Sequence, residues 1–505
     1  MPSGAPAAGK RLAGDAAVLA IGALLTQGAG VATTIVLAHL LPIAEFGSYQ
    51  QLLLIYGIVS PLLFGGVPAA LTYYLSRARS DADRRGWAFD GTVALGALGA
   101  VFGLLLIVLH DPLADLLNGD ERLATAIALL APYAMFTFIA AAMPNALIPV
   151  GRARLSAKLS AATAAVYLAV VVATAIVDPH VRSLAVAMGF SGAFSATLAL
   201  VAVGRAVGYR VRWRGVSARG LQFLRYGFPL ALTGLAGLLG YQFDRLVISA
   251  RYSAEVYAIY AVGAVELPLT VVIQQSINSV LLPELAVRHR DGDVSGMAAI
   301  WREAIRKTSL IILPLFVVCL VLAADLVRFL FGARYAESAT IFRIYLLLMP
   351  PRVATFGLIP MAIGRTRVNL GASIVYLGSN VVLALALVGP LGLKGPAWAT
   401  VIATALTVVY YLVRLRGILR LSITALFPWR TLAGNLAVAA LAALPLVPIV
   451  LMDWPHLVTL LVAGVLYAIC AIAGLRVTRR ISDEDWSRLR ATVRSASRHR
   501  QVTRG

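Results

Sequence analysis

Charged residues are scarce in this chain. Only 13% of its 505 residues are Asp, Glu, Lys or Arg, about half the share found in a typical soluble domain. Hydrophobic residues make up 60% of the chain, so a water-soluble fold would lack polar residues to cover its surface. This composition excludes an ordinary soluble protein and favours one that lies within a lipid bilayer.

The chain also has few residues that bind metals or carry out redox chemistry. Its two cysteines, Cys319 and Cys470, lie inside apolar segments, which is typical of small buried residues rather than of a disulfide. The six histidines are scattered, without the spacing of a metal site. No GxxxxGK[ST] motif is present, so a P-loop ATPase is excluded. We expect no metal and no cofactor.

The formal charge of +21 does not indicate a nucleic-acid partner. Nucleic-acid binders gather basic residues on one folded face, often with aromatic residues for stacking. Here the arginines lie in short loops between apolar segments. That distribution is typical of the signal that orients a membrane protein.

Fourteen apolar segments are candidates for membrane-spanning helices, since a span needs about 20 apolar residues. Their approximate limits are 16–41, 50–76, 87–109, 123–150, 159–177, 184–204, 226–250, 256–286, 308–331, 339–363, 368–388, 396–413, 431–452 and 456–475. The eighth is too long for one crossing, so its ends should lie in the interface or the helix should tilt. We therefore expect an all-α polytopic protein of a cell (plasma or inner) membrane.

The distribution of Lys and Arg predicts the orientation. If both termini are cytoplasmic, 35 of the 44 Lys and Arg residues fall on the cytoplasmic side, as the positive-inside rule requires. The outer loops are short, and the longest, residues 110–122, is too small for a catalytic domain. The tail between Ser482 and Arg500 fits either an interfacial amphipathic helix or a solvated basic segment.

An internal repeat predicts two parallel six-helix lobes. The motif at residues 148–154, IPVGRAR, returns at 361–367 as MAIGRTR, and the Ala-Glu pair at 44–45 returns at 254–255. The two offsets are 213 and 210 residues, so the halves share one direction across the membrane. The predicted parts are a cytoplasmic N-terminus (1–15), an N-lobe (16–204), a basic cytoplasmic linker (205–225), a C-lobe (226–413), a second cytoplasmic linker (414–430), a helical hairpin (431–475) and a basic cytoplasmic tail (476–505).

Charged and polar residues inside spans are costly and therefore mark candidate sites. Glu266, Thr270, Gln274 and Asn278 follow one another at four-residue steps in the eighth span, which would form a polar stripe on one helix. Such a stripe should face protein or a water-filled cavity. Pro268, within it, is expected to bend the helix.

Arg352 lies deep in the tenth span, directly after two prolines that exclude a plain helix there. One hypothesis is that Arg352 meets an anionic ligand while Glu266 lines the same cavity. The other is that the two residues form a buried ion pair that locks the bundle. The sequence leaves both open.

Three further charged residues belong to the candidate set. Arg343 lies nearer the end of the tenth span, and Asp244 lies with Arg245 near the outer end of the seventh. An interfacial ion pair is the favoured interpretation of Asp244. Arg77 closes the second span and is either an orienting charge or part of an inner gate that meets phosphate.

Several motifs resemble those of a known family. They are LLPIAEFGSY (40–49), RYGFPLAL (225–232), QFDRLVI (242–248), LPEL (282–285) and FGARYAE (331–337). In this order the segments are similar to the oligosaccharide (O-antigen/polysaccharide) flippases of the multidrug/oligosaccharidyl-lipid/polysaccharide exporter superfamily. The resemblance implies two six-helix lobes around a central cavity that opens alternately to each side. It also implies a polyprenyl-diphosphate-linked oligosaccharide moved from the inner to the outer leaflet. It further implies that membrane lipids, a polysaccharide polymerase and glycosyltransferases are partners.

Other functions stay open at this stage. Lipid II flippases of the same superfamily carry essential arginines in their first two helices, where this chain has only Arg77. A drug or cation antiporter would need a carboxylate in the first half, and the nearest are Asp15 and Asp90. A membrane glycosyltransferase, ligase or polymerase would need a large outer loop, so an enzyme is not expected. A purely structural role is disfavoured by the costly charges within the spans.

Overall fold

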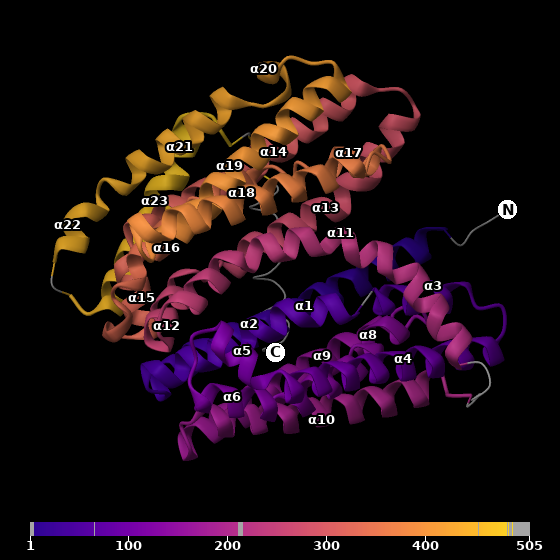
Figure 1. Ribbon diagram of the computed structural model, residues 1–505. Helices are drawn as coiled ribbons and strands as arrows, with labels where there is room; N and C mark the ends of the chain where they lie inside the picture. The colour runs from indigo at the N-terminus through magenta and orange to yellow at the C-terminus, as the bar shows by residue number, and fades with distance from the viewer. Residues whose placement is uncertain are drawn as a thin grey trace, which may run out of the picture. The chain divides into compact units, whose positions relative to one another are not determined.

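The computed structural model describes residues 5–64, 66–210, 216–452, 454–481, 483 and 487, and this part of the chain forms helices with no strand (Figure 1). Helices are expected because a segment in hydrocarbon must satisfy its backbone hydrogen bonds internally. The all-α prediction is confirmed. The interfacial helix predicted between Ser482 and Arg500 lies outside the described residues, apart from positions 483 and 487.

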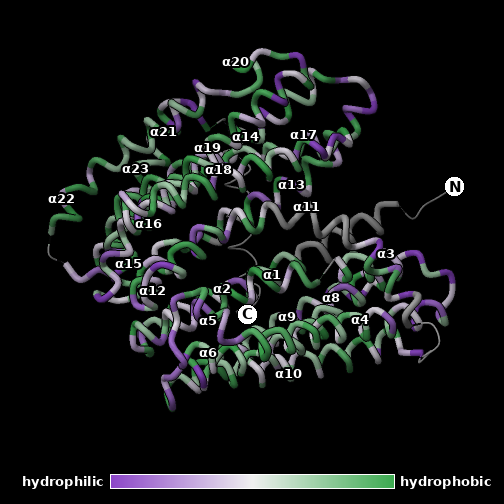
Figure 2. The backbone as a smooth tube through the Cα atoms, in the orientation of Figure 1, coloured by the Kyte–Doolittle hydropathy of each residue, from purple (hydrophilic) through white to green (hydrophobic). Residues whose placement is uncertain are grey.

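Nine helices in the described part are long and apolar enough to cross a membrane. They cover Val18–Leu40, Asp81–Val108, Glu121–Leu147, Ala153–Val177, Val181–Ala206, Val294–Val321, Arg367–Leu391, Lys394–Leu419 and His456–Val477, and a bent pair, Ile43–Phe64 with Val67–Arg77, makes a tenth candidate. Figure 2 shows these helices mostly in hydrophobic colours. The chain is therefore a multi-pass membrane protein, while the count of fourteen spans stays a prediction.

The chain forms two compact units. Unit 1 comprises Met1–Pro268 and Ser373–Ala403, and unit 2 comprises Leu269–Ala372 and Thr404–Gly505. Helices α18 (Arg367–Leu391) and α19 (Lys394–Leu419) each contribute residues to both units. The boundaries of the two predicted six-helix lobes stay a prediction.

Unit 1 holds the first twelve helices: α1 Ala5–Leu40, α2 Ile43–Phe64, α3 Val67–Arg77, α4 Asp81–Val108, α5 His110–Leu116, α6 Glu121–Leu129, α7 Ala131–Ala140, α8 Ala142–Leu147, α9 Ala153–Val177, α10 Val181–Ala206, α11 Val216–Arg251 and α12 Ala254–Gly263. Helix α1 packs along α9, and α7 packs between α4 and α10. Gly47 permits the close approach of α2 to α12, because a Cβ atom there would lie 1.9 Å from the carbonyl oxygen of Ala254.

Unit 2 holds α13 Pro268–Arg290, α14 Val294–Val321, α15 Ala323–Phe331, the 3-10 turn η2 Ala333–Tyr335, α16 Ser338–Leu346, the 3-10 turn η3 Pro350–Val353, α17 Leu358–Ala362, α20 Ile423–Leu426, α21 Trp429–Ala443, α22 Leu446–Leu451 and α23 His456–Val477. Buried hydrogen bonds tie the last two spans to α14. Asn435 Nδ2 donates to Ser309 Oγ at 2.8 Å, and the Tyr467 hydroxyl donates to the carbonyl of Pro314 at 3.0 Å.

Three predicted spans are broken where the sequence places glycine or proline. The second breaks at Gly66, which has a left-handed φ of 70°. The eighth was expected as one helix, but it divides into α12 and α13, and Pro268 opens α13. Proline lacks the N–H that a continuous helix would need and favours a first turn. The irregular backbone expected at Pro350 and Pro351 is confirmed by η3.

The repeated motif adopts the same turn at both places. Gly151 and Gly364 have left-handed φ values of 76° and 72°. The residue after each glycine donates its backbone N–H five residues back, Arg152 to Leu147 at 2.9 Å and Arg365 to Pro360 at 2.8 Å. Glycine favours this ending because it has no Cβ to oppose a positive φ.

Candidate functional site

Arg352 is held at the turn η3 of unit 2. The two prolines before it start this turn and bring the Arg352 side chain beside helix α13, where its Nη1 donates to Thr270 Oγ1 at 3.3 Å. Gln274, one helical turn after Thr270, donates its Nε2 to the backbone carbonyl of Arg352 at 3.2 Å. The structure thus brings together two predicted site residues, Arg352 and Gln274, and the stripe residue Thr270.

A small cavity lies beside this contact. Gln274, Arg352, Thr308 and Thr355 contribute polar groups to its lining, and its volume is about 10 Å³, room for about one water molecule. Asn278, one turn further along α13, has a buried Oδ1 with no hydrogen-bond partner among the described residues. The cavity must enlarge before a diphosphate can enter.

Glu266 is not on the helix that carries this site. It lies in the break between α12 and α13, before Pro268, so the predicted helical stripe begins at Thr270 rather than at Glu266. Glu266 belongs to unit 1 and Arg352 to unit 2. Both interpretations of the Glu266–Arg352 relation therefore stay predictions.

Asp244 lies in the helical hairpin α11–α12. Its side chain is fully buried, and its Oδ2 accepts a hydrogen bond from the Tyr260 hydroxyl at 2.8 Å. Arg245 donates to the carbonyl of Ala264 at 2.7 Å. Tyr260 of the next helix covers the carboxylate, and the interpretation of Asp244 and Arg245 as an interfacial pair stays a prediction.

The other two candidate arginines are exposed. Arg77 ends α3, where its guanidinium lies 4.5 Å from the ring centre of Tyr73 and its Nη1 donates to the Tyr73 hydroxyl at 2.7 Å. Arg343 is exposed on α16.

An ion cluster in unit 1 was not predicted. Arg219, in the first turn of α11, donates its Nη1 to Asp90 Oδ2 at 3.1 Å and lies 3.8 Å from Asp83. Its guanidinium stacks over Trp87 at 4.6 Å. Asp90 is 1% exposed. The sequence showed Asp90 as a carboxylate within the third span but gave no sign of its partner, which lies 129 residues away.

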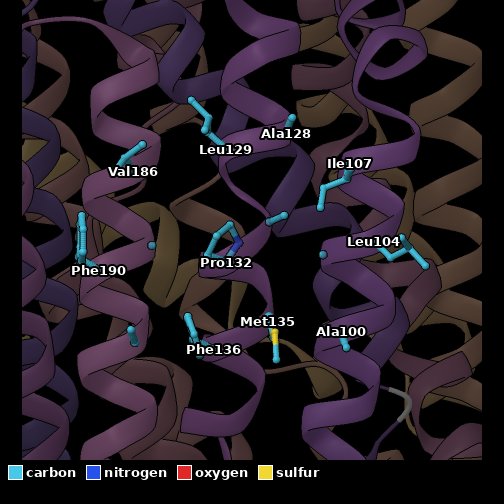
Figure 3. A pocket seen from close by; sticks show the side chains of 14 residues that line it. Ala100, Leu104, Ile107, Ala128, Leu129, Pro132, Met135, Phe136, Val186 and Phe190 are labelled. Carbon is cyan, nitrogen blue, oxygen red and sulfur yellow. The ribbon is translucent and has the colours of Figure 1, made fainter.

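An apolar groove on unit 1 is not part of this site. Its volume is about 710 Å³, and fourteen apolar residues of α4, α6, α7 and α10 line it, among them Leu104, Pro132 and Phe190 (Figure 3). The lining offers no group that could bind a sugar or a diphosphate. Because the groove is apolar and lies on helices that are candidate membrane spans, it is suited to contact with the hydrocarbon chains of lipids.

The described residues contain no group of three His, Cys, Asp or Glu side chains that could hold a metal ion. The candidate site is therefore built from one guanidinium, hydroxyls and carboxamides. Such groups can bind and release an anionic ligand.

A protein-family comparison fits this arrangement. The family described as polysaccharide biosynthesis protein matches residues 36–340, more than half of the chain. The chain belongs to this polysaccharide biosynthesis protein family. The resemblance to polysaccharide flippases of the multidrug/oligosaccharidyl-lipid/polysaccharide exporter superfamily is thereby confirmed.

One curated relative is a probable lipid II flippase MurJ of Rhizobium meliloti (strain 1021). It is 31% identical over 190 residues, which are 36% of this chain and 35% of the relative. The chain therefore matches about a third of that relative's length. For this chain, the activity of that relative is therefore only a proposal.

Solved structures confirm the fold. A lipid II flippase MurJ in an inward closed conformation matches 91% of this chain and 99% of its own, with a TM-score of 0.70 and 16% identity. An inward-facing multidrug resistance MATE family transporter matches 78% of this chain and 95% of its own, with a TM-score of 0.62 and 17% identity. This member of the polysaccharide biosynthesis family thus has the helical fold that MurJ and MATE proteins share.

Proposed function

We propose that this protein moves a polyprenyl-diphosphate-linked oligosaccharide from the inner to the outer leaflet by alternating access, for polysaccharide export. The observation that carries the proposal is the position of Arg352 in the turn η3 of a predicted span, where its side chain donates to Thr270 and its backbone carbonyl accepts from Gln274. A diphosphate crossing a bilayer needs a cation on its path, because an anion in hydrocarbon is costly. The guanidinium suits phosphate since it donates two parallel hydrogen bonds.

The geometry of α13 supports a binding role. The contact that Arg352 makes with Thr270 is a long hydrogen bond to a neutral hydroxyl, which a phosphate oxygen can replace with a stronger, charge-assisted bond. Gln274 holds the backbone of Arg352, and Asn278 places a carboxamide one turn away. Arg352, Gln274 and Asn278 therefore form the proposed diphosphate site. Glu266, in unit 1, is proposed as a further substrate-binding residue.

Arg343, Asp244 and Arg77 have lesser roles in the proposal. Arg343 and Arg77 are exposed cations that can attract the diphosphate before it reaches Arg352. Asp244 is buried against Tyr260 and contributes through the position of α12. The proposed orientation keeps both termini in the cytoplasm of a cell-membrane protein, with polymerase and glycosyltransferases as partners in polysaccharide synthesis.

A lipid II flippase is the second candidate, favoured by the name of the curated relative. Both substrates contain a polyprenyl diphosphate, so the proposed role of Arg352 in binding the diphosphate fits either substrate. The proposal prefers the oligosaccharide because the matching family is one of polysaccharide biosynthesis. A cation antiporter is less well supported, since Arg219 engages Asp90, one of the two carboxylates that the sequence offered for it.

The test compares Arg352 variants in proteoliposomes that carry a labelled polyprenyl-diphosphate oligosaccharide. Arg352→Lys keeps the charge but loses the planar fork, so we expect a partial loss of flipping, and Arg352→Ala should lower the rate by more than tenfold. Arg328→Ala removes an exposed arginine from α15 and should leave the rate unchanged. Melting temperatures show whether each variant folds.

The rival hypothesis of a locking pair gives a different result. If Glu266 and Arg352 only satisfy each other, Arg352→Ala lowers stability by leaving a buried carboxylate. The double variant Glu266→Gln with Arg352→Gln would then recover both stability and flipping. A normal flipping rate in the double variant contradicts the diphosphate role of Arg352.

A further inference from the structure

Four tyrosines meet inside unit 1, far along the chain from the residues of the proposed diphosphate site. Tyr49 and Tyr56 come from α2, Tyr133 from α7 and Tyr167 from α9. The hydroxyls of Tyr49 and Tyr167 lie 2.9 Å apart, and the Tyr56 hydroxyl donates to Thr137 Oγ1 at 2.9 Å. The ring centres of Tyr56 and Tyr133 are 5.1 Å apart, and those of Tyr133 and Tyr167 are 6.1 Å apart.

The cluster lies in the middle of the membrane-spanning segments. Tyr56, Tyr133 and Tyr167 each fall near the centre of a candidate span and are each half-buried, whereas Tyr49 is 1% exposed. A half-buried hydroxyl in the centre of a span is unfavourable against lipid, because hydrocarbon offers it no hydrogen bond. These side chains should therefore face an interior space.

Helix α9 shows which way Tyr167 faces. The exposed positions of α9 recur every three or four residues, at Leu155, Lys158, Ala162, Ala165, Ala169, Ala173 and Ile176. These positions form the lipid face of the helix. Tyr167 lies on the opposite side, since it is two residues from both Ala165 and Ala169 on a helix of 3.6 residues per turn.

The same interior side of α9 is polar along its length. Ser156, Ser160, Thr163 and Thr174 lie at helical spacing with Tyr167. Their hydroxyls are small, neutral, and both donors and acceptors. The interior face of α9 thus continues the tyrosine cluster as a surface that carries hydroxyl groups and no charge.

The chemistry of the cluster differs from that of the site at Arg352. The hydrogen bonds and ring contacts of these tyrosines involve other tyrosines, Thr137 and apolar rings, and no arginine, lysine or carboxylate among the described residues. A diphosphate would find no cation here. A neutral polyhydroxylated ring would find hydroxyl groups for its own hydroxyls and aromatic faces for its C–H groups.

We propose that the tyrosine cluster of unit 1 binds the sugar of the transported molecule. This assignment rests on the proposed function. It names neutral carbohydrate as the ligand of a site on α2, α7 and α9. Tyr133 and Tyr167 contribute ring faces and hydroxyls, and Tyr49 positions the Tyr167 hydroxyl through the 2.9 Å contact.

The test measures the affinity of purified, detergent-solubilised full-length protein for two probes. One probe is a polyprenyl diphosphate without sugar, and the other is the same lipid bearing one N-acetylhexosamine. The wild type should bind the glycosylated probe more tightly. Tyr133→Phe and Tyr167→Phe keep the rings and remove the hydroxyls, so each should reduce that preference by about 3- to 10-fold, the effect expected for one neutral hydrogen bond.

Two matched variants separate this role from a structural one. Tyr467→Phe removes the hydroxyl of a buried tyrosine in unit 2, which donates to the carbonyl of Pro314, and should leave the preference for the sugar unchanged. Arg352→Lys should weaken both probes by the same factor. A merely structural role of the tyrosines would change the melting temperature, or both affinities together, without changing their ratio.

The outcomes also separate this inference from the proposed function. If the wild type binds both probes equally, or if the tyrosine variants keep the wild-type ratio, the sugar site is wrong while a diphosphate flippase remains supported. If neither probe binds, the proposed function fails as well. A reduced ratio in Tyr133→Phe and Tyr167→Phe, with no change in Tyr467→Phe, supports the assignment.

Discussion

Arg219 is a single side chain on which the stability of unit 1 should depend, because its ion-pair partner, Asp90, is buried. The Asp90 side chain is 2% exposed and that of Arg219 is 21% exposed, with 3.1 Å between Nη1 and Oδ2. Gly86 makes room for the guanidinium, because a Cβ atom there would lie 2.5 Å from Arg219 Nη1. The pair holds the first turn of α11 against α4.

We predict that Arg219→Gln lowers the free energy of unfolding by about 2–4 kcal/mol, because it leaves a buried carboxylate without its cation. The double variant with Asp90→Asn should recover most of the loss, since it removes the charge as well. Arg84→Gln is the control: its pair with Asp81 is exposed, at 3.5 Å, and contributes about 0–1 kcal/mol. Thermal unfolding in detergent measures all three, and equal losses in Arg219→Gln and Arg84→Gln would contradict the assignment.

The sequence predicted individual site residues better than their partners. The cost of charge in hydrocarbon indicated Arg352, and the four-residue spacing placed Thr270 and Gln274 on one face of a helix. The structure joins all three. Spacing could not show that Arg219 pairs with Asp90, because that contact depends on how α11 packs against α4. It also could not show that Tyr260 buries Asp244.

At the scale of elements, apolar length predicted where helices lie and missed where they break. Each of the nine candidate spans overlaps a predicted one. The breaks at Gly66 and before Pro268 interrupt segments whose hydropathy is continuous. Hydropathy measures the preference for hydrocarbon and is insensitive to the φ value or the missing N–H that ends a helix.

These breaks bear on function because they expose polar groups where a straight helix would hide them. The turn η3 exists because Pro350 and Pro351 follow one another, and it brings the carbonyl of Arg352 to Gln274. Irregular backbone within a membrane is tolerated where it is buried in protein or lines a cavity. The break therefore supports the location of the proposed diphosphate site.

The tyrosine cluster also depends on elements rather than on single residues. Its members come from three helices, and no spacing in the sequence connects them. A signal was nevertheless present, since a tyrosine lies near the centre of several predicted spans rather than at the membrane interface, where tyrosine is usually enriched.

At the scale of the whole molecule, the uneven distribution of Lys and Arg predicts that both termini are cytoplasmic. The measurement uses an otherwise cysteine-free protein, with Cys319 and Cys470 replaced by alanine. A membrane-impermeant maleimide added to intact cells should label Asn118→Cys and miss Ala218→Cys. The reverse pattern would overturn the orientation, and with it the direction of transport.

The central claim concerns the substrate, and flipping in proteoliposomes of purified protein tests it most directly. Three labelled substrates are compared: a polyprenyl-diphosphate oligosaccharide, lipid II and a cationic drug. The account predicts that the wild type accelerates the transfer of the oligosaccharide lipid between leaflets, and that Arg352→Ala in the same membranes does not. Acceleration of lipid II alone, or of the drug alone, would contradict it.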